Sequence, residues 1–336
     1  MSEGSISALT EGLRRVALVG LAKNTGKTET LAALLRELAQ KDIRVGVTSV
    51  GRDGEEHDVI DARIDKPRIH LQAGSLVAST GALLRASGVA HERLAQTGVR
   101  TPLGEVAIAR LSEEGAVEVA GPSAAADVRA VSEAMLGYGA EQVLIDGAID
   151  RRAASSPAVS DGLVMATGAV LGESIEQVVA ATSDAVQLVR LPPAGESPEP
   201  VAIPRRLVLS GEPAEIAALL AEHPRTSAFA VEGALSERFI EGLLAARRER
   251  SGREIEIVAE DPTRVFLTRH GPGWYARQGI AIAARKGIDL RAITVNPVAP
   301  QAHSFDSRGL RELIEAAIPD VPVLDVCDED YLALAK

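Results

Sequence analysis

The stretch Val16–Thr30, VALVGLAKNTGKTET, restricts the fold of this chain more than any other. Its first four residues are β-branched or apolar, which is typical of a buried strand. Gly20 then opens a loop that ends in GKT at residues 26–28, and the leucines that follow have the spacing of an amphipathic helix. Strand, glycine-bounded loop, GKT and helix, in this order, predict a phosphate-binding P-loop in an α/β fold.

The residue types of the loop suit a nucleoside triphosphate. Amides at a helix N-terminus bind phosphate oxygens, Lys27 can reach the β- and γ-phosphates, and the Thr28 hydroxyl can bind Mg²⁺. The common pattern has four residues between the first glycine and GK, whereas this chain has five, LAKNT. The expected nucleotide contacts are Gly20, Lys23, Asn24, Thr25, Gly26, Lys27, Thr28 and Glu29.

Acidic residues after two further strands are candidate metal ligands. The apolar run Gln142–Ile145 ends in Asp146, and an aspartate that ends a strand beside a P-loop commonly binds Mg²⁺. Asp53 follows the predicted strand Ile43–Val50, at the strand end where α/β sheets bind ligands. An ordinary turn aspartate and a solvated acidic loop are the alternatives. The predicted metal ligands are Thr28, Asp53 and Asp146. The predicted catalytic residues are Lys27, Lys23 and Asp146.

Composition narrows the function further. Formal net charge is −11 and aromatic residues make up 2% of the 336 residues, which argues against a nucleic-acid partner. The single cysteine, Cys327, excludes a disulfide within the chain and is expected to be a plain buried thiol. The polar N-terminus has no signal-peptide core and no stretch is long enough to span a membrane, so we expect a soluble cytoplasmic protein.

Strands alternate with helices along the chain, which predicts a mostly parallel sheet. We expect a nucleotide-binding domain at 1–192, a proline-rich linker at 193–205 and a C-terminal α/β domain at 206–336. The second half echoes the first: FAVEGALSER matches VLIDGAIDRR, and residues 207–223 resemble the P-loop unit without its loop. A degenerate repeat is therefore one interpretation of the second half.

The sequence also predicts individual helices and strands between residues 66 and 120 and beyond the proline-rich linker. Residues 66–100 are expected to form a broken helical connection, and Glu105–Leu111 with Ala116–Ala120 a hairpin. Beyond the linker, the apolar runs predict four strands: Leu207–Leu209, Ala228–Val231, Ile255–Val258 and Ala292–Val295. The intervening segments predict four helices: Ala214–Glu222, Ser236–Arg248, Gln278–Lys286 and Ser307–Ala317.

The loop GLAKNTGKT resembles the P-loops of dethiobiotin synthetases and cobyrinate amidases, in the SIMIBI class of nucleotide-binding proteins, and KN-x-GKT resembles the MobB family. A resemblance over most of the chain is to the KamB subunit of lysine 5,6-aminomutase reactivases. It is carried by VGLAKNTGKTETL, SVGRDGEEHDVI, KPRI, TPLGEVAIARL, VLIDGAIDRRAA, VSDGLVMATGA, EDPTRVF and ITVNPVAP.

This resemblance implies an ATP-dependent reactivating factor that acts with a MutS-related partner subunit on an adenosylcobalamin-dependent lysine aminomutase. The cobalamin motif D-x-H-x-x-G is absent from the chain, so any link to cobalamin would run through a partner. A ligase or kinase similar to dethiobiotin synthetase and a nucleotide-binding regulator are the alternatives. ATP is favoured and GTP is not excluded. By analogy with the class, Asn296-Pro297 would lie near the base, and a homodimer is an open alternative.

Overall fold

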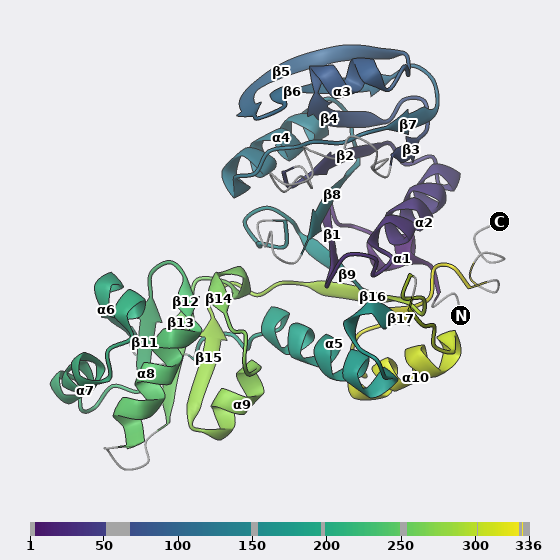
Figure 1. Ribbon diagram of the computed structural model, residues 1–336. Helices are drawn as coiled ribbons and strands as arrows, with labels where there is room; N and C mark the ends of the chain where they lie inside the picture. The colour runs from purple at the N-terminus through teal and green to yellow at the C-terminus, as the bar shows by residue number, and fades with distance from the viewer. Residues whose placement is uncertain are drawn as a thin grey trace. The chain divides into compact units, whose positions relative to one another are not determined.

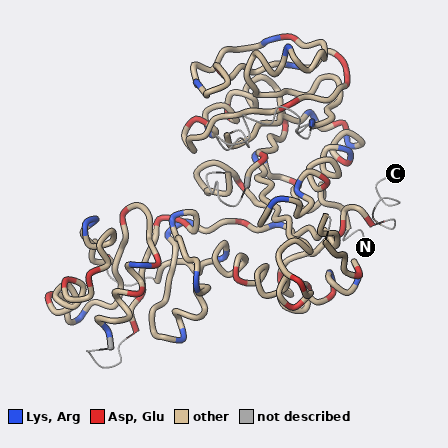
Figure 2. The backbone as a smooth tube through the Cα atoms, viewed as in Figure 1, with Lys and Arg blue, Asp and Glu red and all other residues tan. Residues whose placement is uncertain are grey.

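A computed structural model of the protein describes residues 4–51, 68–148, 154–195, 199–248, 254–300, 302–328 and 331. The chain forms a mixed α/β structure with two compact units (Figure 1). The first unit contains Met1–Thr182 and Asp289–Lys336, and the second contains Ser183–Ile288. Acidic and basic residues are interspersed along both units (Figure 2). Among the described residues, no helix combines the length and the apolar composition that crossing a bilayer requires.

A nine-stranded sheet forms the centre of the first unit, in the order β17-β16-β9-β1-β8-β2-β4-β6-β5. The strands are β1 (Arg15–Gly20), β2 (Val45–Ser49), β4 (Leu76–Thr80), β5 (His91–Thr101), β6 (Gly104–Leu111), β8 (Gln142–Ala148), β9 (Gly162–Gly168), β16 (Leu290–Asn296) and β17 (Val323–Leu324). Only the pairings of β4 with β6 and of β6 with β5 are antiparallel among the described strands of this sheet. The prediction of a large, mostly parallel sheet is confirmed.

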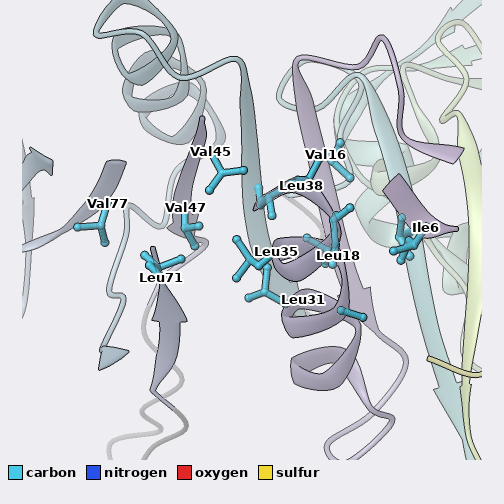
Figure 3. Close-up of a cluster of buried hydrophobic side chains, with 14 of the residues drawn as sticks. Ile6, Val16, Leu18, Leu31, Leu35, Leu38, Val45, Val47, Leu71 and Val77 are labelled. Atoms are coloured by element: carbon cyan, nitrogen blue, oxygen red, sulfur yellow. The ribbon is translucent and has the colours of Figure 1, made fainter. Parts of the chain in front are cut away.

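Helices cover both faces of this sheet. The helices of the first unit are α1 (Ile6–Leu9), α2 (Lys27–Gln40), α3 (Gly81–Ala86), α4 (Ala125–Gly137), the short 3₁₀ helix η1 (Ala169–Leu171), α5 (Ile175–Val189), which continues into the second unit, and α10 (Ser307–Ala317). The leucines of α2 pack against Val16 and Leu18 of β1 and against alternate residues of β2 (Figure 3). Gly46, on the other face of β2, lies against Met135 of α4. Helices α2 and α4 therefore cover opposite faces.

The second unit has its own four-stranded parallel sheet, β10 (Val201–Ile203), β11 (Ala228–Val231), β13 (Ile255–Ala259) and β15 (Ile280–Ala284), in that order. Its other elements are α6 (Arg205–Ser210), α7 (Pro213–Glu222), β12 (Leu235–Ser236), α8 (Glu237–Arg248), η2 (Pro262–Arg264), β14 (Val265–Phe266) and α9 (Pro272–Arg277). Fully buried Phe229, Phe239 and Tyr275 belong to its separate hydrophobic core. The unit thus has the core that an independent folding domain requires.

The two units divide the chain differently from the three segments expected from the sequence. The last 48 residues, Asp289–Lys336, belong with the first unit and not with the preceding α/β segment. The reason is that β16 pairs with β9 in the nine-stranded sheet and β17 pairs with β16. Apolar alternation indicates that Ala292–Val295 is a strand, but it does not specify which sheet receives it.

Residues 66–100 differ most from their expected structure. The described part of this region forms β4, α3, β5 and a short strand, β3 (Ile69–Leu71). The expected hairpin is also wrong, because β6 pairs with β4 and β5, whereas β7 (Gly115–Val117) pairs with β3. Leucine and alanine are good helix formers, and in β5 the pairing with β6 overrides that preference.

In the second unit, the strands β11 and β13 and the helices α7 and α8 lie where the sequence predicts them. Leu207–Leu209 is helical, within α6, and Gln278–Lys286 contains β15 rather than a helix. Residues 207–223 therefore form two helices separated by Gly211, without the strand that a repeat of the P-loop unit would need. In the first unit, Ser307–Ala317 is helical as predicted.

Candidate functional site

The loop after β1 is folded tightly onto itself. The Leu21 amide donates to the carbonyl oxygen of Ala166 at 2.9 Å, which extends the contact between β1 and β9. The buried hydroxyl of Thr25 donates to the Ala22 carbonyl oxygen at 3.0 Å. A Cβ atom on Gly20 would lie 2.6 Å from Thr25 Oγ1, closer than real Cβ contacts allow, so the first glycine of the motif is required by the loop's own packing.

Helix α2 begins without a capping side chain. Its N-cap residue, Gly26, has a left-handed φ of 84° and no side chain that could cap the helix. Because the first helical bond runs from the Thr30 amide to the Gly26 carbonyl oxygen, the amides of residues 27–29 have no acceptor within the helix. Helix α10 is different, since its first turn is capped by the carboxylate of Asp306, which accepts from the Gly309 amide at 2.7 Å. The start of α2 therefore suits an anion.

Lys27 and Asp146 are brought together by the order of the strands. Strand β8 is the direct neighbour of β1, and Asp146 lies in register with Leu18. Lys27 Nζ is 2.8 Å from Asp146 Oδ1, and the two side chains are 18% and 24% exposed. On the other side of β8, the Val50 amide donates to the Asp146 carbonyl oxygen at 2.8 Å. Two of the three predicted catalytic residues thus form one partly exposed ion pair beside the loop that follows β1.

The oxygen donors at this place fit a magnesium–nucleotide complex. Thr28 is exposed in the first turn of α2, and the partly exposed carboxylate of Asp146 lies beside the same turn. Mg²⁺ in phosphoryl-transfer sites usually takes one or two protein oxygens, with phosphate oxygens and water as its other ligands. Within the described ranges, no group of three or more His, Cys, Asp or Glu side chains could hold a metal by itself. The predicted ligand Asp53 lies outside the described residues.

Of the remaining predicted contacts, Lys23 and Asn24 belong to the loop and Glu29 to the first turn of α2. Lys23, Asn24 and Glu29 are exposed, and Asn24 has a positive φ of 64°.

Cys327 is exposed, so its expected burial is wrong. The short strand β17 ends at Leu324, before Cys327. The Cys327 amide donates to the Asp325 carboxylate at 2.9 Å, as in a turn, and not to a neighbouring strand.

One contact of the loop follows from the fold and not from the P-loop motif. Asn296, at the end of β16, donates from Nδ2 to the Asn24 carbonyl oxygen at 2.8 Å. On the same strand, the buried Thr294 hydroxyl is 2.7 Å from the Thr30 hydroxyl of α2. Asn296 was expected near a nucleotide base, and the structure places its side chain against Asn24 and Gly26 in the loop after β1. In the sequence, Asn296 can be recognised only as a polar residue directly after the apolar run ITV. That pattern does not reveal that the side chain contacts Asn24.

Comparison with known proteins adds no relative to this description. No family model matches the chain. No curated protein and no solved structure matches it either.

Proposed function

We propose that this chain is a P-loop NTPase that binds a nucleoside triphosphate, with ATP favoured, as its Mg²⁺ complex at residues 20–28. The observation that carries the proposal is the combination at the start of α2. An uncapped helix of 14 residues follows a buried parallel strand, and the Lys27–Asp146 ion pair of 2.8 Å lies beside its first turn. This combination provides both cationic and backbone donors for phosphate oxygens.

Each residue would contribute a separate function. The Lys27 ammonium, now paired with Asp146, would exchange that partner for the β- and γ-phosphate oxygens. Thr28 and Asp146 would hold the magnesium ion, and Lys23 and the loop amides would surround the phosphate chain. A bound Mg²⁺ would withdraw charge from the transferred phosphoryl group. The Asp146 carboxylate therefore has two competing cationic partners, and nucleotide binding decides between them.

The start of the segment after β2 connects this site to a candidate switch. Val50 bonds to the Asp146 carbonyl oxygen, and the Gly51 amide donates to the Pro122 carbonyl oxygen at 2.7 Å. The residues that follow, including Asp53, lie outside the described ranges. We propose that the nucleotide state biases this segment, in the way that γ-phosphate contacts order switch loops in other NTPases.

For the biological role, we propose ATP-driven reactivation of an adenosylcobalamin-dependent lysine 5,6-aminomutase, together with a MutS-related partner subunit. The support is the resemblance of the sequence, from the P-loop to ITVNPVAP near β16.

The test is ATP turnover by the full-length protein, with and without inactivated lysine aminomutase holoenzyme. The proposal predicts that the client raises turnover several-fold and that Lys27→Ala abolishes it. Lys41→Ala, at the exposed far end of α2, is the matched control and should leave turnover unchanged. Turnover that is present but indifferent to the client would remove the support for reactivation.

A small-molecule kinase or ligase is the second candidate, favoured by one observation at the end of β4, which β2 separates from β8 in the sheet. The Thr80 hydroxyl, at the end of β4, is fully buried, and it has no hydrogen-bond partner in the part of the chain that the structure describes. Such a group is rare in native proteins and is a candidate contact for an acceptor substrate. A burst of ADP triggered by a small molecule without any protein client would favour this function. Tight nucleotide binding without hydrolysis would instead indicate a regulator.

A further inference from the structure

We propose that Asn296 is a positioning residue for the phosphate loop, which it holds from β16, more than 260 residues further along the chain. This inference rests on the proposed nucleotide site, and it assigns to Asn296 a role in phosphate binding rather than in base recognition. The carboxamide donates to the carbonyl oxygen of Asn24, the one loop residue other than glycine with a positive φ. Asparagine adopts left-handed backbone more readily than other non-glycine residues, but the conformation is still uncommon, so the hydrogen bond from Asn296 stabilises the loop at the turn that Asn24 makes.

The orientation of this carboxamide is fixed by two bonds. Asn296 Nδ2 donates to the Asn24 carbonyl oxygen at 2.8 Å, and Asn296 Oδ1 accepts from the Val298 amide at 3.1 Å. Exchanging the nitrogen and oxygen would place two acceptors together at Asn24 and two donors together at Val298. The second bond therefore keeps the donor of Asn296 directed at the loop.

Close packing adds to the hydrogen bond. The Asn296 side chain lies so near Gly26 that a Cβ atom there would be 3.0 Å from Asn296 Cβ. Thr294 lies two residues before Asn296 and therefore on the same face of β16. Its hydroxyl forms a hydrogen bond with the hydroxyl of Thr30, near the start of α2. Strand β16 is itself held by β9, which is paired with β1, so the support is rigid. The loop is thus fixed between its own strand and Asn296 before any phosphate binds, which lowers the cost of ordering it.

Two ligands separate loop positioning from base recognition. Inorganic tripolyphosphate has the phosphate chain of ATP but no base or ribose. If Asn296 acts through the loop, Asn296→Ala weakens the binding of Mg-ATP and of Mg-tripolyphosphate by the same factor, about fivefold for one hydrogen bond. If Asn296 contacts the base, only the binding of Mg-ATP is weakened, and that result would overturn the proposal.

Two further variants test whether a loss of affinity comes from the missing hydrogen bond or from a general effect of substitution in this region. Asn296→Asp keeps the acceptor for the Val298 amide, replaces the donor to Asn24 with an oxygen and adds a negative charge near the phosphates, so it should weaken both ligands more than alanine does. Leu313→Ala changes an exposed side chain of α10 that has no part in these contacts and should leave both affinities unchanged. Binding is measured by titration calorimetry on the full-length protein, with thermal unfolding as a check on folding. Unchanged affinities in both Asn296 variants would also overturn the proposal.

Failure of the proposed function is recognised separately. If the wild-type protein binds neither ligand, or if Lys27→Ala binds both ligands as the wild type does, there is no phosphate site at this loop. The proposed function and the role of Asn296 then fall together. If Lys27→Ala loses both ligands and the Asn296 variants lose neither, only the present inference fails.

Discussion

At the scale of single residues, the ion pair between Lys27 and Asp146 is the central contact of the candidate site. Both side chains are partly exposed, so solvent weakens their attraction and an incoming phosphate can replace the carboxylate. The pair therefore keeps Lys27 near the loop at little cost to nucleotide binding. Both residues were predicted from the sequence as site residues. Their direct contact depends on β8 being adjacent to β1, which the local sequence pattern does not specify.

Asp146→Asn tests the two roles of this carboxylate. Removing the negative charge frees Lys27 and reduces repulsion of phosphate, so binding of ATP without magnesium should be retained or become tighter. The stimulation of binding and turnover by Mg²⁺ should fall about tenfold or more, since a magnesium ligand is lost. Titrations with and without Mg²⁺ measure both effects. An unchanged magnesium dependence would show that Asp146 does not bind the metal.

Glu237 in the second unit gives a prediction about pH. Burial by itself raises the pKa of this carboxyl. Hydrogen bonds from Thr268, from the Arg269 amide and from the Tyr275 hydroxyl outweigh it and lower the pKa from 4.5 to about 2. A lowered pKa in the folded state stabilises the protein above pH 4.5, and this stabilisation is lost as the pH falls toward 2. The unit Ser183–Ile288 should therefore lose stability over this interval.

Glu237→Gln should reduce the stability of that unit at pH 7 by about 2 kcal/mol and flatten its dependence on pH below 4.5. Trp274, the single tryptophan of the chain, lies 3.9 Å from the ring of His270 in a stacked arrangement, and the amide of His270 donates to Glu237. Urea unfolding followed by tryptophan fluorescence therefore reports on this region. Glu241→Gln, which removes a more exposed ion pair with Arg269, is the matched control. Equal effects of the two variants would contradict the prediction.

At the scale of elements, helix α2 is fixed at both ends by distant parts of the chain. Near its C-terminal end, the buried carboxylate of Glu37 accepts from the Ser7 amide at 2.8 Å and from the Tyr331 hydroxyl. The Tyr331 hydroxyl in turn accepts from the Ile6 amide at 3.1 Å. Burial and the neighbouring carboxylate raise the pKa of Tyr331. This network joins α1, α2 and the C-terminal segment.

Tyr331→Phe should cost about 2 kcal/mol of stability, because it leaves a buried carboxylate and a buried amide without one partner each. Tyr138→Phe removes a hydroxyl from a residue that is 40% exposed and should cost far less. Chemical denaturation followed by circular dichroism compares the two variants. Comparable losses would show that the buried network does not stabilise α2.

The elements also show what the sequence can and cannot specify. Strand β1 and helix α2 follow from local pattern alone, since apolar runs, a glycine-bounded loop and leucine spacing all indicate the same units. Strand β5 does not, because HERLAQTGVRT contains good helix formers and becomes a strand only by pairing with β6. Asn296 is a similar case, since its contact with the loop depends on the order of strands in the sheet.

At the scale of the whole molecule, the chain leaves the first unit after Thr182 and returns to it at Asp289. Each unit has a separate core, and the candidate nucleotide site belongs entirely to the first. The proline-rich stretch at 193–205 was expected to separate two successive domains, but it lies within the second unit. A proline-rich composition shows where regular secondary structure is interrupted. The boundary between the units depends instead on which strands pair with one another in each sheet.

This division predicts selective stabilisation by ligand. Saturating Mg-ATP, at about 100 times its Kd, should stabilise the first unit by about 3 kcal/mol. The tryptophan signal of Trp274 in the second unit should change much less, whereas circular dichroism should detect the shift of the first unit. Urea unfolding with both probes, with and without Mg-ATP, makes the comparison. Equal shifts in both signals would show that the two units unfold as one.

The most direct test of the whole account is the binding of Mg-ATP to the full-length protein, measured by titration calorimetry. The account predicts a saturable site in the wild-type protein that Lys27→Ala weakens at least tenfold, as expected for a charged hydrogen-bond donor. Lys41→Ala, at the other end of the same helix, should bind as the wild type does. No binding by the wild type, or equal binding by Lys27→Ala, would contradict the assignment of this loop as a nucleotide site.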